Sequence, residues 1–159
     1  MTAGEGDAPA AKPPHVLIVE APYYAEVAAG LLAGARRILD DAGATHELVQ
    51  VAGAFELPGA IRMAIRAMAR AGGPHWDGFL ALGCVVRGET DHYDHIAREA
   101  ARGLMDLSVQ FGVPVAFGVL TVHDEAQALA RARDDETNKG AEAARALLAQ
   151  IALARRWGL

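Results

Sequence analysis

Residues 77–86 read Asp-Gly-Phe-Leu-Ala-Leu-Gly-Cys-Val-Val, and this stretch decides the fold. From Phe79 to Val86 it is continuously apolar, whereas a strand with one solvated face would alternate apolar and polar residues. The run is also far too short to cross a bilayer as a helix. It therefore predicts a strand in the middle of a parallel sheet that is covered on both faces.

Strands and helices alternate on either side of this central strand. Short β-branched or alternating runs predict further strands at residues 15–20, 47–51 and 113–120. Apolar residues at helical spacing predict helices over 24–41, 59–71, 92–111, 125–131 and 138–157. This order predicts an α/β fold, a three-layer α/β/α sandwich with a four-stranded parallel sheet.

Composition narrows the class of protein. The chain has 159 residues, of which 52% are hydrophobic, and a formal net charge of −5 with no long basic stretch. Clustered lysines and arginines that would neutralise nucleic-acid phosphates are missing, so we expect no nucleic-acid partner. Because the longest apolar run is too short to cross a bilayer, we also expect no membrane span. The single cysteine, Cys84, allows no internal disulfide, and its apolar surroundings predict a buried, inert thiol.

The N-terminal residues 1–14 differ in composition from the rest of the chain. They are rich in alanine, glycine and proline, and they lack the charged-then-apolar layout of a signal peptide. We expect a disordered leader over 1–14, a single domain over 15–159 and a cytoplasmic location.

Loops at the carboxyl ends of the strands are candidate sites, because ligands bind there in parallel sheets. Tyr23 and Tyr24 follow the first strand, and an aromatic ring there can stack on a planar ligand or pack at an interface. The turn Gly-Ala-Phe-Glu-Leu-Pro at 53–58 follows the second strand. Its amides could bind the edge of a heterocycle and Glu56 could accept from sugar hydroxyls; alternatively, Glu56 only begins the next helix.

The loop Arg-Gly-Glu-Thr-Asp-His at 87–92 joins the central strand to a helix. Free N–H groups at a helix start attract anions, and Gly88 would let a phosphate approach the backbone, whereas the Glu89 carboxylate would repel it. Taken alone, the loop fits an ordinary turn better, with Thr90 or Asp91 as the helix N-cap.

Three more side chains are candidates for chemistry. His92 could transfer protons near neutral pH, while His92 and His95 alone are too few ligands for a metal site. Arg131 and Lys139 could bind a phosphate, or they could pair on the surface with the acids of the loop at 134–137.

Four segments, taken in order, carry a resemblance that no single motif carries. They are Gly-Ala-Phe-Glu-Leu-Pro at 53–58, Leu-Gly-Cys-Val-Val-Arg-Gly-Glu-Thr-Asp-His-Tyr-Asp at 82–94, Val-Pro-Val-Ala-Phe-Gly-Val-Leu-Thr at 113–121 and Asn-Lys-Gly-Ala-Glu-Ala-Ala at 138–144. Together they resemble the lumazine synthases, the riboflavin synthase β-chain family, and especially its alphaproteobacterial members. The resemblance covers about residues 15–157 and implies a flavodoxin-like fold, with the N-terminal segment as a candidate for joining a neighbour's sheet.

The resemblance also implies an activity. It is that of a transferase that condenses 5-amino-6-(D-ribitylamino)uracil with 3,4-dihydroxy-2-butanone 4-phosphate to 6,7-dimethyl-8-ribityllumazine, phosphate and water, the penultimate step of riboflavin biosynthesis. Neither a cofactor nor a metal is implied. The implied unit is a homopentamer; because 134–137 lacks the Gly-Thr-Lys-x-Gly pattern of capsid-forming members, we expect an isolated pentamer over a shell.

Roles follow from the resemblance position by position. His92 matches the acid/base histidine and Tyr23 the aromatic residue that stacks on the pyrimidine. The ring and ribityl chain would be held by Ala54, Phe55, Glu56, Val85 and Val86, and the phosphate by Gly88, Glu89 and Thr90. Phe117, Arg131 and Lys139 match residues lent by a neighbouring subunit, with Arg131 at the phosphate and Lys139 near the pyrimidine.

Two other functions would suit the same scaffold. One is a lumazine- or riboflavin-binding protein without catalysis, against which the set of His92, Arg131 and Lys139 argues. The other is a purely structural shell subunit, against which the altered loop at 134–137 argues.

Overall fold

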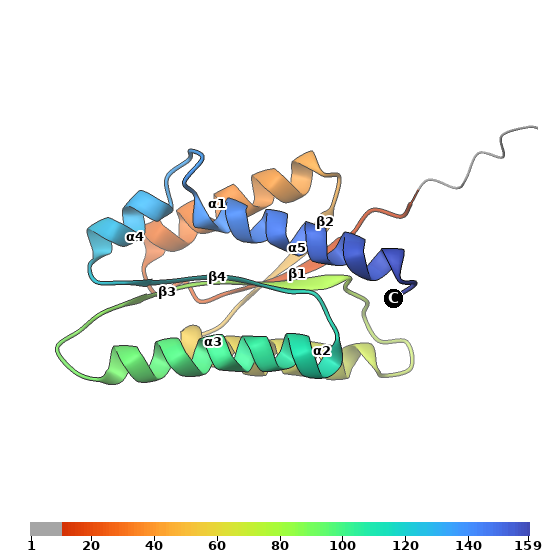
Figure 1. Ribbon diagram of the computed structural model, residues 1–159, viewed down its shortest axis with the longest axis horizontal. Helices are drawn as coiled ribbons and strands as arrows, with labels where there is room; N and C mark the ends of the chain where they lie inside the picture. The colour runs from red at the N-terminus through yellow and green to blue at the C-terminus, as the bar shows by residue number, and fades with distance from the viewer. Residues whose placement is uncertain (1–10) are drawn as a thin grey trace, which may run out of the picture.

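Four parallel strands form one sheet at the centre of the computed structural model, which describes residues 11–159 (Figure 1). In chain order the strands are β1 (His15–Glu20), β2 (Thr45–Gln50), β3 (Gly78–Val86) and β4 (Val115–Val122). One face is covered by α1 (Ala25–Asp41), α4 (Glu125–Arg131) and α5 (Lys139–Arg156), the other by α2 (Leu57–Met68) and α3 (His92–Phe111). The predicted three-layer sandwich is confirmed.

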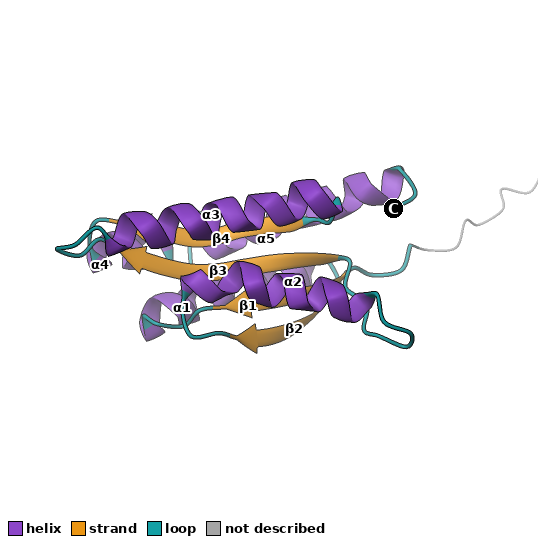
Figure 2. Ribbon diagram, turned by 90° about the horizontal axis from the view of Figure 1, so that it is seen from below, coloured by secondary structure: helices purple, strands orange, loops and turns teal. Residues whose placement is uncertain are grey.

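The strand order is β2-β1-β3-β4, so β1 and β3 are the inner strands and β4 is an edge strand (Figure 2). β3 pairs with β1 on one side and with β4 on the other, and its residues from Gly78 to Val85 are all buried. The continuous apolar run was therefore a correct signal for a central strand.

Alternating side chains of β1 supply both cores. Leu17 and Val19 face α2 and α3, whereas Val16 and Ile18 face α1 and α5. Because successive side chains of a strand point to opposite faces, a strand between two helical layers must be apolar at every position.

Backbone hydrogen bonds to the neighbouring strand, and not the apolar pattern, determine where the outer strands β2 and β4 begin and end. β2 begins two residues earlier than predicted because the Thr45 amide donates to the Pro14 carbonyl (2.9 Å) as the pairing with β1 starts. β4 runs on to Val122 because its last residues pair with the end of β3. The helix α2 begins at Leu57, earlier than the predicted residue 59, since a short 3₁₀ turn, η1 (Ala54–Glu56), runs directly into it.

The predicted leader lies largely outside the described residues, as does the segment expected to join a neighbour's sheet. Residues 11–14 are described and form neither helix nor strand. They contact the domain through two carbonyls: that of Lys12 accepts from Arg155 Nη1 (2.7 Å) and that of Pro14 accepts from Thr45. No helix within residues 11–159 is long and apolar enough to cross a membrane.

Candidate functional site

A cavity of about 490 Å³ opens at the carboxyl end of the sheet, between the ends of β1 and β3. The chain leaves these two strands for opposite faces, with α1 after β1 and α3 after β3 (Figure 1). In doubly wound sheets such a reversal leaves a crevice in which ligands bind. This strand-end cavity is lined by Tyr23, Tyr24, Ala52, Gly53, Ala54, Phe55, Glu56, Cys84, Val85, Val86, His92 and Ile96.

Tyr23 and Tyr24 differ in how far they are exposed. The Tyr23 ring is 75% exposed, whereas Tyr24 is half-buried and packs against the cluster that includes Val27 and Cys84. The two rings meet edge to face with centroids 5.0 Å apart. Burial, and then the nearby Cys84, Tyr23 and Glu125, raises the pKa of Tyr24. Tyr24 thus supports Tyr23, and Tyr23 presents the free ring face.

The turn η1 brings a polar and an aromatic side chain to the same cavity. Ala54 is buried and anchors the turn, while Phe55 is 60% exposed. Glu56 occupies the N-cap position of α2, but its carboxylate makes no cap hydrogen bond there. Its Oε2 lies over Gly53, where a Cβ would approach it to 3.3 Å. The Glu56 carboxylate therefore lies at the cavity wall and also directly before α2, so its role toward hydroxyls and its role at the helix start both stay predictions.

The loop between β3 and α3 does not line the strand-end cavity. Gly88, Glu89 and Thr90 are all exposed, and a Cβ on Gly88 would meet nothing within 4 Å. Asp91 stands at the N-cap position of α3 without a side-chain cap bond, and the His92 amide only meets Thr90 Oγ1 at 3.4 Å. Of the two predicted N-cap residues, Asp91 therefore occupies the position, but its side chain forms no capping hydrogen bond.

His92 begins α3 at the edge of the strand-end cavity. Its side chain is exposed to solvent. Among residues 11–159, no group of three His, Cys, Asp or Glu side chains is placed to hold a metal ion.

The buried thiol of Cys84 forms part of the same cavity wall. Burial, with a smaller contribution from the Glu125 charge, raises its pKa to about 11. The thiol therefore stays protonated near neutral pH. The prediction that Cys84 is buried is confirmed, and its inertness stays a prediction.

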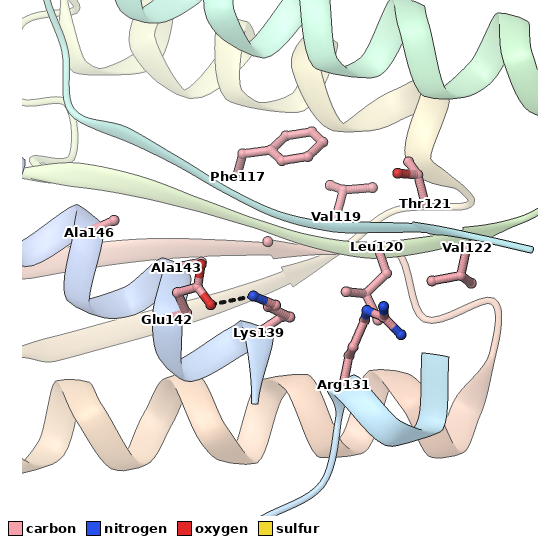
Figure 3. Close-up of a pocket in the computed structure, with 11 residues that line it drawn as sticks. Phe117, Val119, Leu120, Thr121, Val122, Arg131, Lys139, Glu142, Ala143 and Ala146 are labelled. Carbon is pink, nitrogen blue, oxygen red and sulfur yellow. Dashed lines mark hydrogen bonds and ion pairs between the residues drawn. The ribbon is translucent and has the colours of Figure 1, made fainter. Parts of the chain in front are cut away.

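A second cavity, of about 320 Å³, lies along the free edge of β4 (Figure 3). Arg131 and Lys139 reach it from one side of β4 and Phe117 from the other. We call it the edge cavity; its lining is Phe117, Gly118, Val119, Leu120, Thr121, Val122, Arg131, Lys139, Glu142, Ala143 and Ala146. Phe117 is 47% exposed, which is unusual for an aromatic residue in a strand with a covered sheet.

The two cations do not pair with the acids at 134–137 in the described part of the chain. Lys139 Nζ instead lies 2.6 Å from Glu142 Oε2, one turn further along α5. The Arg131 guanidinium donates from Nη1 to the Gln127 carbonyl (2.9 Å) and forms no ion pair with a described residue. Asp134 approaches Arg37 instead, at 3.7 Å. The surface-pairing alternative is therefore wrong, and Arg131 retains donors for an anion.

The structure thus divides the predicted site residues into three groups. The strand-end cavity collects Tyr23, Ala54, Phe55, Glu56, Val85, Val86 and His92; the edge cavity collects Phe117, Arg131 and Lys139; Gly88, Glu89 and Thr90 lie in the open loop before α3. The two cavities share no lining residue. Glu142 was missed by the sequence reasoning, although its spacing of three residues from Lys139 on one helix face could have revealed the pair.

Comparisons with known proteins identify the family of the chain. The family model for 6,7-dimethyl-8-ribityllumazine synthase matches residues 13–155. The chain is 52% identical to 6,7-dimethyl-8-ribityllumazine synthase 1 of Rhizobium meliloti over 92% of its own length and 95% of the relative's.

Two further relatives carry the name 6,7-dimethyl-8-ribityllumazine synthase. The protein of Methylocella silvestris is 53% identical, with 91% of this chain and 87% of the relative covered. That of Paramagnetospirillum magneticum is 48% identical, with 91% and 97% covered. Fold, strand-end cavity and similarity over nearly the whole chain lead to one conclusion: the chain belongs to the 6,7-dimethyl-8-ribityllumazine synthase family of riboflavin-pathway transferases, as alphaproteobacterial relatives do.

Proposed function

We propose that the chain condenses 5-amino-6-(D-ribitylamino)uracil with 3,4-dihydroxy-2-butanone 4-phosphate to 6,7-dimethyl-8-ribityllumazine, in a site completed by a neighbouring subunit. The observation that carries the shared site is the division of its residues between two cavities with no common wall. A substrate in the strand-end cavity of one subunit would meet the edge cavity of the next.

The strand-end cavity suits the pyrimidine substrate. Tyr23 offers an exposed ring face for stacking, and the ends of β3 at Val85 and Val86 offer backbone groups to the heterocycle. The Glu56 carboxylate can accept hydrogen bonds from the hydroxyls of the ribityl chain. The ligand class is thus a planar, polar ring with a polyol tail.

The phosphate of the second substrate suits the open start of α3. The amides of Gly88, Glu89 and Thr90 precede a long helix whose positive dipole end favours an anion. The Arg131 guanidinium of the neighbour would add charge-assisted hydrogen bonds to the same phosphate. The loop binds through its backbone, with the Glu89 carboxylate directed away from the phosphate.

The chemistry needs proximity and proton transfer. The 5-amino group attacks the ketone and water leaves as the imine forms; phosphate is then eliminated as a proton is lost from the adjacent carbon. The enol left by this elimination takes up a proton at its terminal carbon and becomes a methyl ketone. The ribityl-bearing nitrogen attacks this newly formed carbonyl, and a further water leaves as the ring closes. His92, between the two substrate positions, can accept and return protons near neutral pH, and holding both substrates together supplies much of the rate enhancement.

The assembly that this site requires is a ring. A head-to-tail contact that joins the edge cavity to the next strand-end cavity is heterologous, and it closes when the rotation between subunits divides a full turn. The family resemblance suggests five subunits and the acidic loop at 134–137 favours isolated rings, because like charges repel at a junction between them. The cytoplasmic location of the protein, expected from the sequence, likewise stays a prediction.

Turnover is the test of this proposal. Purified protein mixed with both substrates should produce lumazine fluorescence well above the uncatalysed rate, and release phosphate in equal amount. A protein that binds lumazine tightly without accelerating its formation would instead establish the non-catalytic binding function.

A further inference from the structure

One buried side chain, Asn138, joins α1, the loop between α4 and α5, and the start of α5. It is 1% exposed and sits at the N-cap position of α5. Its Oδ1 accepts from the Ala141 amide (2.9 Å), and its Nδ2 donates to the carbonyls of Gly30 on α1 (3.0 Å) and Arg133 in the α4–α5 loop (2.9 Å). All the hydrogen-bonding capacity of the Nδ2 group is thus used inside the protein.

Glycines make this close approach possible. A Cβ on Gly34 would lie 2.1 Å from Asn138 Oδ1, and one on Gly30 would lie 2.2 Å from the Ala132 carbonyl. A Cβ on Gly140 would come 2.0 Å from the Leu31 carbonyl. The loop and the start of α5 therefore lie directly on the α1 backbone, at a distance that larger residues would not allow.

The loop so restrained carries both cations of the edge cavity at its ends. Arg131 is the last residue of α4 and Lys139 the first of α5, with Asn138 directly before it. Asn138 does not line the edge cavity itself. The geometry points to Asn138 as a positioning residue that holds Arg131 and Lys139 for the neighbour's substrates; this inference rests on the proposed function.

The hydrogen bonds separate this role from ordinary helix capping. Capping of α5 uses only Oδ1, whereas both bonds of Nδ2 go to segments outside α5. A serine at the same position is a good N-cap but has neither the reach nor the second donor. Asn138→Ser thus keeps the cap and releases the loop from α1.

The experiment compares Asn138→Ser with Ile151→Val, a conservative core change on the same helix and far from the loop. We expect Asn138→Ser to raise the KM for the butanone phosphate by about tenfold, below the roughly hundredfold that a misplacement of about 1 Å can cost. The kcat should fall much less, and Ile151→Val should leave both KM values unchanged. In an Arg131→Ala background, Asn138→Ser should change this KM by less than about twofold, because it acts through the missing side chain.

Three results would overturn the inference. The first is an unchanged KM for the butanone phosphate in Asn138→Ser. The second is an equal rise of this KM in Ile151→Val. The third is a further tenfold rise when Asn138→Ser is added to Arg131→Ala. If Asn138→Ser does not fold, Gly30→Ala replaces it. The added Cβ would displace the Ala132 carbonyl while Asn138 stays intact. Gly30→Ala should then raise the KM for the butanone phosphate, with little effect on kcat and little further effect in the Arg131→Ala background.

Amide hydrogen exchange separates this inference from the proposed function. Amides of residues 132–137 should exchange faster in Asn138→Ser than in the parent chain, and at the parent rate in Ile151→Val. A parent chain that forms no lumazine would contradict the proposed function; the exchange rates would still show whether Asn138 restrains the loop. Unchanged exchange in Asn138→Ser would contradict the restraint whatever the turnover.

Discussion

Tyr23 and Tyr24 are adjacent in sequence but have different surroundings. Both line the strand-end cavity, but Tyr23 is exposed there, whereas Tyr24 is half-buried and packs against the cluster that includes Cys84. Replacing Tyr23 by alanine should weaken the binding of a ribityl-lumazine ligand and leave the thermal midpoint nearly unchanged. Tyr24→Ala should instead lower the thermal midpoint, because it removes buried aromatic area. Fluorescence titration and thermal unfolding of both variants check this, and weaker binding for Tyr24→Ala alone would move the stacking role to Tyr24.

His92 is the side chain on which the proton transfers of the proposed mechanism depend. We expect His92→Ala to lower kcat by about a hundredfold, the low end for general acid–base groups, because positioning of the substrates supplies much of the rate. The KM values should change little. Steady-state kinetics across the neutral pH range provide the measurement. A variant with parental kcat at each pH would remove His92 from the mechanism.

Several residue-level properties were readable from the sequence and others were not. The buried state of Cys84 followed from its apolar neighbours, and the family motifs located His92. The absence of a cap bond from Asp91 depends on a side-chain rotamer, which residue type and spacing do not determine.

At the scale of elements, the amino ends of β1 and β2 are joined by a polar cluster. Glu47 Oε2 accepts from Trp76 Nε1 (2.5 Å) and lies 2.8 Å from His15 Nε2, while His15 Nδ1 lies 2.6 Å from Thr45 Oγ1. The hydrogen bonds to His15 and then Trp76 lower the pKa of Glu47 below its ordinary value of 4.5. The cluster therefore links the edge strand β2 to the inner strand β1 and to the segment before β3.

This cluster predicts an acid dependence of stability. Because the folded-state pKa of Glu47 is depressed, its contribution is complete above the unfolded value of 4.5 and is lost as the pH falls through the lower folded value. Urea unfolding from about pH 6 to about pH 3 should show parent and Glu47→Gln converging in free energy of unfolding as the pH falls. A constant difference between them at all pH values would show that the Glu47 charge does not contribute. Glu136→Gln, an exposed change in the loop between α4 and α5, serves as control.

The elements themselves were largely predictable. The bounds of β1, α3 and α4 agree with the sequence expectation, because apolar period and polar turns coincide there. The ends of β2 and β4 were displaced by two residues, because hydrogen bonds with neighbouring strands extend a strand beyond its apolar segment. Local pattern carries no information on such pairing.

At the scale of the whole molecule, the edge cavity collects the exposed Phe117 of β4 and two cations from α4 and α5, whereas the acid/base candidate His92 lies at the strand-end cavity. The sequence already placed Arg131 and Lys139 on flanking helices, but the absence of a common wall between the cavities follows only from the packed structure. Arg131→Ala should weaken binding of the butanone phosphate by about 1.5–3 kcal/mol, because the Arg131 guanidinium is proposed to bind the phosphate in the neighbour's site.

Subunit mixing tests the shared site most directly. Chains carrying His92→Ala and chains carrying Arg131→Ala are refolded together in equal amounts, and mixed rings are verified by native mass spectrometry. If each site takes His92 from one subunit and Arg131 from the next, roughly a quarter of the sites pair two intact residues, since each half is drawn independently. At a butanone-phosphate concentration well below the KM of the Arg131→Ala variant, the account predicts that lumazine formation reappears at about a quarter of the parental rate. Verified mixed rings that are no more active at that concentration than rings of either variant alone would contradict it.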